Sequence, residues 1–280
     1  MSKIIVQVIV CCYGRKYTTI NCLSKFYEIV KDSNIEYKVT LVDDKCPEYT
    51  GKAVELNFPQ AKVVYSSGNL YWAKSMSLGI QESDSTYDYL LWLNDDVDLY
   101  DNFSDEIEKC IQNGETKNTI WVGATNDSNG KISYSGVKRG NWPYLTNFKR
   151  VYDRSESVKC DAFNGNFVLI PKSIDDLLGG ICDKYTHGFS DFDYGLRCSK
   201  HNLDINVIPK FIGHCERNSV ENTYKDNSLS REKRLKLLFG PKGLPFKDWL
   251  LFNWRHAKST LIVGVFLPYL SVFLNVLFRK

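Results

Sequence analysis

The sequence lacks the features that mark several large classes of protein. Its 280 residues carry a formal net charge of only +3, so charge does not indicate nucleic acid as a partner. It contains no internal repeat and no low-complexity segment, which argues against a repeat architecture or a disordered chain. Hydrophobic residues make up 43% and charged residues 25%, proportions typical of a globular protein.

The nine cysteines lack the spacing of a metal or redox site. No two form a C-x-x-C pair, their number is odd, and Cys11 and Cys12 are adjacent within an apolar run. His214-Cys215 alone is a weak zinc signal. The first apolar run, IIVQVIVCC, is short, is interrupted by Gln7 and has no small-residue cleavage site, so we expect a buried strand and no secretory leader. We therefore expect reduced, core-forming cysteines in a protein facing a reducing compartment.

Short apolar runs alternate with helical segments in the first half of the chain. The pattern predicts strands at 4–11, 37–44, 61–66, 88–93 and 119–124, and helices at 18–31 and 71–83. This alternation indicates an α/β domain with a mainly parallel sheet. Ligands of such sheets bind outside the carboxyl ends of the strands.

The second half of the chain is less regular. After a loose stretch rich in Gly, Asn and Ser, we predict a strand that leads into a helix at Pro171. A helix is predicted at 190–202, with Ser190 as its N-cap, and a strand at 204–209 follows it.

We expect three parts along the chain: a domain at 1–225, a basic helical extension at 226–258 and an apolar tail at 259–280. The tail contains the apolar run 261–278, which Pro268, a serine and an asparagine make a poor membrane span. Basic residues flank this run: Arg255, His256, Lys258, Arg279 and Lys280. A buried core helix and a true span stay open, but we expect a helix lying on the membrane surface.

Two of the predicted strands end in paired aspartates. Asp43 and Asp44 end the strand at 37–44, and Asp95 and Asp96 follow the strand at 88–93. A solvated turn that caps a helix would explain either pair. A divalent cation held by hard oxygen ligands would explain both, and their shared position at strand ends favours this second interpretation.

Four ordered stretches resemble one family of enzymes. They are VDD at 42–44, SSGNLYWAKSMSLGI at 66–80, LNDDVDL at 93–99 and GFSDFDYGLR at 188–197. Together they resemble the family-2 glycosyltransferases, inverting enzymes of the GT-A fold, and in particular rhamnosyltransferase-like members that build bacterial cell-envelope glycans. The likeness extends over about residues 4–220 and implies a mixed, mostly parallel central sheet with helices on both faces.

The resemblance implies a binding site for a nucleotide-sugar donor. The matched positions are Cys12, Tyr13, Arg15, Asp43, Asp44, Gly68, Asn69, Lys74, Asn94 and Asp95. Cys12 and Gly14 depart from the Thr-Tyr-Asn that family members often have, so uracil and thymine both stay open as the base. Lys74 stands where many members have Gly or Ala, and a solvated helix lysine is an equal interpretation.

The same resemblance implies a metal site and a catalytic base. Asn94-Asp95-Asp96 aligns with the Asp-x-Asp motif, which makes Asp96 the expected ligand of Mg²⁺ or Mn²⁺, and His214 falls where many members place a histidine near the metal. Asp191 matches the base that takes the proton of the acceptor hydroxyl. Further residues are assigned to acceptor binding, Asn164, Gly165 and Asn166, and to bracing the catalytic helix, Asp193 and Arg197.

We therefore expect a metal-dependent transferase that moves a sugar from a UDP- or dTDP-linked donor to a hydroxyl of a cell-envelope or polyprenol-linked glycan. Its expected location is cytoplasmic, peripheral on the inner face of the cell membrane. A nucleotidyltransferase acting on a sugar phosphate is one alternative, although CCYGRKY offers only one glycine for a phosphate loop. A non-catalytic sugar-binding protein is another, because Asn94 and Ser190 stand at usually acidic positions.

Overall fold

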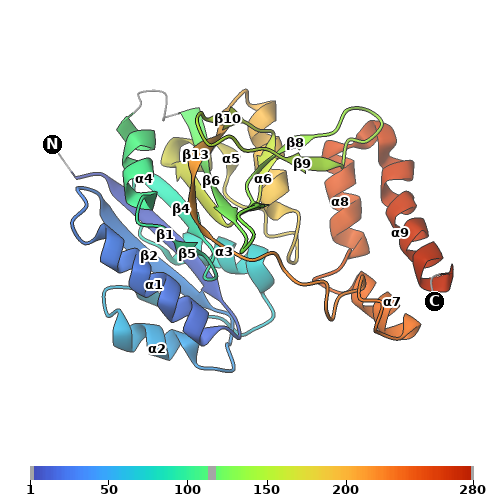
Figure 1. The fold of residues 1–280 in the computed structure, drawn as a ribbon, viewed down its shortest axis with the longest axis horizontal. Helices are drawn as coiled ribbons and strands as arrows, with labels where there is room; N and C mark the ends of the chain where they lie inside the picture. The colour runs from blue at the N-terminus through green and yellow to red at the C-terminus, as the bar shows by residue number, and fades with distance from the viewer. Residues whose placement is uncertain (1–2, 113–117, 279–280) are drawn as a thin grey trace.

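The computed structural model describes residues 3–112 and 118–278, which form a central sheet flanked by helices (Figure 1). Its strands lie in the order β10-β13-β6-β12-β4-β1-β2-β3, with β5 paired to β13 and β7 to β6. Their bounds are β1 Ile5–Cys12, β2 Glu36–Asp43, β3 Lys62–Tyr65, β4 Tyr89–Leu93, β5 Asp98–Leu99, β6 Thr119–Asn126, β7 Ile132–Tyr134, β10 Val158–Lys159, β12 Phe167–Pro171 and β13 Asp204–His214. A second, small sheet joins β11 (Ala162–Phe163), β8 (Gly136–Arg139) and β9 (Phe148–Arg150).

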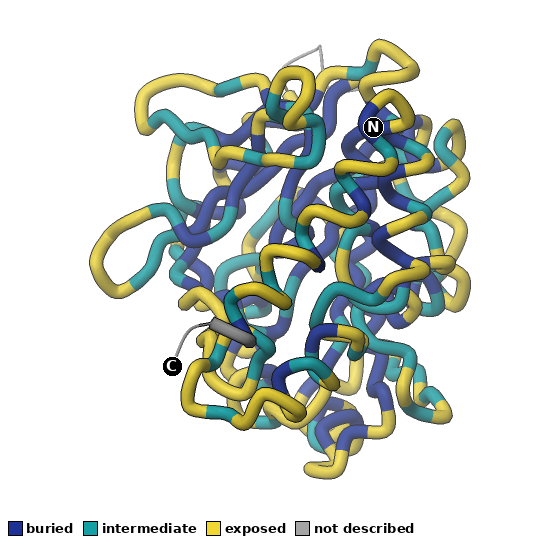
Figure 2. The backbone as a smooth tube through the Cα atoms, turned by 90° about the vertical axis from the view of Figure 1, so that its right-hand side faces the viewer, coloured by how far each residue is buried: buried dark blue, intermediate teal, exposed yellow. Residues whose placement is uncertain are grey.

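Parallel pairing joins β3, β2, β1 and β4, and also β6 and β13. Antiparallel β12 lies between β4 and β6. Strands such as β4, buried along their whole length, read as continuous apolar runs because helices cover both faces of the sheet. Figure 2 shows these strands as the buried centre of the molecule.

Two hydrophobic clusters lie on opposite faces of the sheet. Three helices pack on one face: α1 (Lys16–Val30), α2 (Thr50–Asn57) and α4 (Phe103–Gln112). Three pack on the other: α3 (Tyr71–Glu82), α5 (Lys172–Leu178) and α6 (Ser190–Lys200). The predicted α/β fold, with a mixed, mostly parallel sheet and helices on both faces, is confirmed. All nine cysteines are free and seven of them are buried, as expected of core residues.

The C-terminal helices gather at one end of the molecule, away from α1 and α2 (Figure 1). They are α7 (Arg231–Phe239), α8 (Phe246–His256), a 3₁₀ turn at Lys258–Thr260 and α9 (Leu261–Phe278). Trp249 and Phe252 of α8 form a third cluster with Tyr185 and Tyr269. The helices thus share a core with the sheet domain, and the predicted division at 225 and 258 stays a prediction.

The predicted N-cap of α6 is wrong. The helix begins at Ser190 itself, and Phe189 precedes it in a left-handed conformation with φ of 71°. The Ser190 hydroxyl has no hydrogen-bond partner among the described residues, so it does not cap the helix. Instead, the carbonyl oxygen of Phe189 accepts a hydrogen bond from Asp193 N–H in the first turn of α6, at 2.7 Å.

Gly195 brings α6 against the small sheet. A Cβ atom at this position would lie 2.6 Å from the Cα atom of Ala162 in β11, a contact with backbone that cannot rotate away. We expect Gly195→Ala to lower the free energy of unfolding by roughly 1–3 kcal/mol, the usual cost of overpacking, despite the better helix propensity of alanine. Gly188→Ala is the control, because a Cβ there meets nothing within 4 Å. Thermal denaturation of both variants tests this, and equal midpoints would contradict it.

Candidate active site

The carboxyl ends of three neighbouring strands meet at one edge of the central sheet. β2, β1 and β4 are parallel neighbours, so Asp43, Cys12 and Leu93 end on the same side. β12 runs antiparallel to β4, and the turn before it, 164–166, therefore reaches the same edge. The fold thus gathers the predicted donor, metal and acceptor residues where ligands bind in sheets of this type.

Asp95 and Asp96, just after β4, share one positively charged partner, the side chain of Arg15. The guanidinium of Arg15 forms an ion pair with each carboxylate, and Thr19 donates a hydrogen bond to Asp95 at 2.8 Å. Asp95 is only 1% exposed, and this burial raises the pKa of its carboxyl, an effect that Arg15 opposes. The positive charge of Arg15 explains why adjacent carboxylates can lie together here. Contact between Arg15 and a nucleotide base stays a prediction.

Asp43 and Asp44 are buried and bind backbone amides. Asp43 accepts hydrogen bonds from the N–H groups of Cys46, at 2.5 Å, and Gly51, at 2.7 Å. Asp44 accepts one from Leu70 N–H at 3.0 Å and others from neighbouring groups before and at the start of α3. The two carboxylates therefore stabilise the loops beside this edge of the sheet. Their contact with the base or ribose stays a prediction.

The other predicted donor residues differ in exposure. Gly68 and Asn69 both have positive φ, 97° and 64°, and form a left-handed turn before α3. Their contact with the donor stays a prediction. Cys12 is buried, whereas Tyr13 is 58% exposed, so the aromatic ring of Tyr13 is accessible to a ligand. Lys74 is exposed and has no ion-pair partner among the described residues.

Asp191 lies in the first turn of α6, where two backbone amides fix its carboxylate. Phe192 N–H donates to it at 2.9 Å and Gly165 N–H at 3.1 Å. Burial raises the pKa of Asp191 to about 6, although both hydrogen bonds act to lower it. Such a carboxylate is ionised at neutral pH and has the basicity that a general base needs.

Hydrogen bonds connect Asp191 to the acids after β4. Gly165, which binds Asp191, precedes Asn166, whose carbonyl oxygen accepts a bond from Asn94 N–H at 2.9 Å. The Asn94 side chain in turn accepts a bond from the Trp72 indole at 2.8 Å. A Cβ at Gly165 would lie 2.4 Å from the Trp72 ring, so this close approach requires glycine. The structure thus brings the predicted base, acceptor turn and acidic motif into one site.

Four buried polar atoms at this site have no hydrogen-bond partner among the described residues. They are Asp96 Oδ1, Asn164 Oδ1, His187 Nδ1 and Ser190 Oγ. Unpaired buried polar atoms are uncommon in folded proteins and call for an explanation. A polar ligand between the acids and α6 would provide the missing partners.

Asp193 anchors the helix that carries Asp191. It is fully buried and pairs with Arg197 at 2.9 Å, with His256 at 2.8 Å and with Arg255 at 3.1 Å. Burial acts to raise the pKa of Asp193, but these partners hold it at about 2. Because Arg255 and His256 belong to α8, the C-terminal helices help to fix the position of α6.

Sequence reasoning missed two residues of the site, Trp72 and His187. Trp72 lies in the matched stretch at 66–80, and His187 stands four residues before Asp191. Burial lowers the pKa of His187 to about 4, and the charges of Lys242 and Arg15 add to this effect. His187 is therefore a neutral ring near the cationic group that pairs with the acids.

The Asp96 carboxylate after β4 would fit a divalent cation that takes its other ligands from a diphosphate and water. No group of three His, Cys, Asp or Glu side chains that could hold a metal occurs in the described parts of the chain. However, Asp96 has an unpartnered buried oxygen, and the Asp95–Asp96 pair already accommodates the charge of Arg15. Mg²⁺ needs only one or two carboxylates when phosphates and water complete its shell. His214 lies 3.3 Å from Glu216, and its role as a ligand stays a prediction.

Solved structures with the same fold include two glycosyltransferases. S. aureus TarS, residues 1–349, superimposes with a TM-score of 0.58 at 11% identity, over 98% of this chain and 75% of that one. GalNAc-T7, solved with UDP, GalNAc and Mn²⁺, gives a TM-score of 0.56 at 12% identity, over 97% of this chain and 57% of that one. At these identities the likeness concerns the fold. No curated protein matches the sequence.

The sequence also matches the family described as glycosyl transferase family 2 over residues 7–178, more than half of the chain. The matched part runs from β1 through α5 and includes Arg15, Asp95 and Asp96, while Asp191 and His214 lie beyond it. The match agrees with the resemblance of the four stretches and with the fold of the solved structures. The chain therefore belongs to glycosyl transferase family 2, and it is a nucleotide-sugar glycosyltransferase of the GT-A fold.

Proposed function

We propose that this glycosyltransferase moves a sugar, with inversion at the anomeric carbon, to a hydroxyl of a cell-envelope or lipid-linked glycan. The observation that carries the proposal is the position of Asp191. Its carboxylate has a pKa of about 6 and is bound through Gly165 to the turn that contacts the acids after β4. A base and a diphosphate site on one edge of a sheet are what an inverting transfer requires.

The proposed donor is a UDP- or dTDP-linked sugar. The exposed ring of Tyr13 offers a stacking face for the base, beside the wall built by Asp43 and Asp44. Arg15, two residues after Tyr13, has N–H groups that suit phosphate oxygens. A divalent cation held by Asp96 would neutralise the charge that develops on the departing nucleoside diphosphate.

Asp191 performs the proton transfer in this proposal. The acceptor hydroxyl gives its proton to the carboxylate while its oxygen forms a bond to the anomeric carbon. The bond from that carbon to the diphosphate breaks on the opposite face, and the leaving group departs with the electron pair. The amides of Gly165 and Phe192 hold the carboxylate in place, and the unpartnered Asn164 oxygen lies ready for a sugar hydroxyl.

Helix α9 supports the proposal that the enzyme works at a membrane surface. Among the described residues, one helical stretch, Lys258–Val276, is long and apolar enough to cross a membrane, and it is 17% buried. Val265 and Tyr269 pack into the third cluster. The exposed apolar side chains follow helical spacing on another face: Ile262, Val263, Phe266, Leu267, Leu270, Phe273 and Leu274. A helix packed on one side and apolar on the other suits the membrane surface. Arg279 and Lys280 lie outside the described residues.

We expect Asp191→Asn to leave donor binding intact and to lower turnover by roughly two to four powers of ten, because the basic oxygen is lost. Turnover of the unmodified enzyme should fall as the pH drops through about 6, because Asp191 must be ionised to accept a proton. The residual turnover of the variant should lack this step. Asp183→Asn, at an exposed acid before α6, is the control. Loss of donor affinity with normal turnover would place Asp191 in the donor site instead.

We expect Asp96→Ala to abolish the stimulation of turnover by Mn²⁺ and to weaken metal-dependent binding of UDP or dTDP. Its unpartnered oxygen is the one available to a cation, and its loss leaves Asp95 paired to Arg15. Asp101→Ala is the matched control, since that side chain is 93% exposed in the same acidic segment. Titration calorimetry with and without Mn²⁺ measures the effect. Unchanged Mn²⁺ dependence would show that the metal lies elsewhere.

We expect Phe266→Asp combined with Leu270→Asp to release the enzyme from vesicles that contain anionic lipid. Both side chains are more than half exposed, so the change should remove membrane affinity and leave the packing of α9 on α8 unchanged. Leu56→Asp with Leu177→Asp adds the same charge at exposed positions on α2 and α5. Co-sedimentation with liposomes, at low and high salt, compares the two. Equal release by both pairs, or none by the first, would contradict a surface role for α9.

A further inference from the structure

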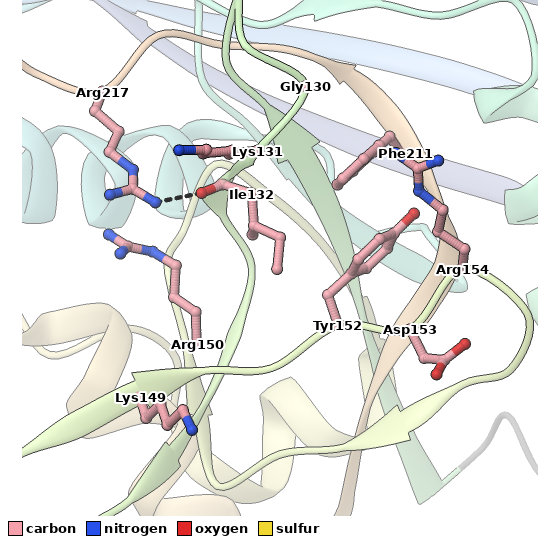
Figure 3. Close-up of a pocket in the computed structure, with 10 residues that line it drawn as sticks. All are labelled: Gly130, Lys131, Ile132, Lys149, Arg150, Tyr152, Asp153, Arg154, Phe211 and Arg217. Atoms are coloured by element: carbon pink, nitrogen blue, oxygen red, sulfur yellow. Dashed lines mark hydrogen bonds between the residues drawn. The ribbon is translucent and has the colours of Figure 1, made fainter.

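A hollow of about 730 Å³ lies beside the transfer site and is lined by cations (Figure 3). It is formed by the start of β7, the segment from β9 to Arg154, and β13 with the residues after it. Five of its lining residues are basic: Lys131, Lys149, Arg150, Arg154 and Arg217. Asp153 is the one acid that lines it. We refer to this site as the basic hollow.

The cations of the basic hollow are not neutralised within the protein. None of the five has an ion-pair partner among the residues that the structure describes. The Asp153 carboxylate is occupied by the amide and hydroxyl of Ser155. Arg150 and Arg217 point toward each other in Figure 3, and burial together with the charge of Arg217 lowers the pKa of Arg150. Two facing guanidinium groups repel each other, and an anion between them would remove that cost.

One wall of the basic hollow is aromatic. The rings of Tyr152 and Phe211 stack with their centroids 4.3 Å apart and their planes 12° from parallel. Arg154 lies 5.7 Å from the centre of the Phe211 ring. A ligand with both anionic groups and an apolar or sugar face would match the two sides of the hollow.

The basic hollow adjoins the acids after β4 through Tyr134. The backbone N–H of Asn218, next to Arg217, donates to the Tyr134 hydroxyl at 3.2 Å. Burial raises the pKa of Tyr134, and the charges of both Asp96 and Arg150 act on it. Tyr134 is therefore close enough to the Asp96 carboxylate and to the Arg150 guanidinium for both charges to act on it, and one acceptor chain could reach both regions.

We propose that the basic hollow binds phosphate groups of the acceptor, so that the molecule that receives the sugar is itself phosphate-bearing. This inference rests on the proposed function and names the acceptor class. A diphosphate that links a glycan to a polyprenol and a phosphodiester in a glycan chain share the recognised chemistry. Arg150 and Arg217 bind the phosphate oxygens, and Tyr152 with Phe211 supports the group attached to them.

Binding to two probes tests the inference without relying on turnover. The probes are a polyprenyl diphosphate sugar in detergent and a short glycerol-phosphate oligomer, each titrated against the full chain. We expect Arg150→Gln with Arg217→Gln to weaken binding of one probe roughly tenfold or more, since a hydrogen bond to a charged group contributes about 1.5–3 kcal/mol. The probe that responds identifies the source of the phosphate. UDP binding in the presence of Mn²⁺ should stay within about twofold of the unmodified enzyme.

The control pair is Arg231→Gln with Lys31→Gln, which removes two exposed positive charges, one at the start of α7 and one just after α1. If both double variants weakened probe binding equally, the loss would come from the lower net charge alone, and the inference would be overturned. Failure of the unmodified enzyme to bind either probe would also overturn it, and so would a parallel loss of UDP affinity, which would assign the hollow to the donor. Hydrolysis of the sugar donor is measured separately. Its absence would contradict the proposed transferase reaction, while phosphate binding in the hollow would still stand.

Discussion

The ion pair of Arg15 with Asp95 and Asp96 is the interaction on which the active-site edge depends. A buried carboxylate without a partner would take up a proton, and a second carboxylate beside it would increase that tendency. Arg15 comes from the loop after β1 and the acids from the loop after β4, so the pair also joins two strand ends. In the proposed reaction, the negative charge of the donor diphosphate would meet this guanidinium and a cation held by Asp96.

A second buried carboxylate, Asp193, transmits the position of the C-terminal helices to the catalytic helix. Its bonds to Arg255 and His256 tie α8 to α6, two residues from Asp191. The indole of Trp249 in α8 donates to the carbonyl oxygen of Gly264 in α9 at 3.1 Å. A continuous set of contacts thus runs from α9, the proposed membrane helix, to the helix that carries Asp191. Under the proposed function, these contacts would fix the position of Asp191 relative to the membrane surface.

Local patterns in the sequence predicted the central elements well, because strands buried on both faces are continuous apolar runs and their polar ends stand out. The family motifs located the Asp95–Asp96 pair and Asp191, and the structure brings them to one edge. The antiparallel insertion of β12 could not be predicted, since an apolar run does not state its direction. Two partners of Asp193, Arg255 and His256, lie more than 60 residues away in sequence, so no local pattern signals them. The sequence pattern also predicted Ser190 as the N-cap of α6, whereas the helix begins at Ser190 and Phe189 precedes it.

The net charge of the chain does not reveal where its charged residues lie. The net charge of +3 suggests no anionic partner, yet acids and bases are separated in space. The acids gather at the ends of β2 and β4, where Arg15 and backbone amides bind them, and unpaired cations gather in the basic hollow. The electrostatic potential at each region of the surface depends on where the charges lie and not on the net charge of the chain. If the basic hollow binds the phosphate of the acceptor, as proposed, the acceptor phosphate and the donor diphosphate would bind at separate places, the first among the unpaired cations and the second at the edge where Arg15 lies.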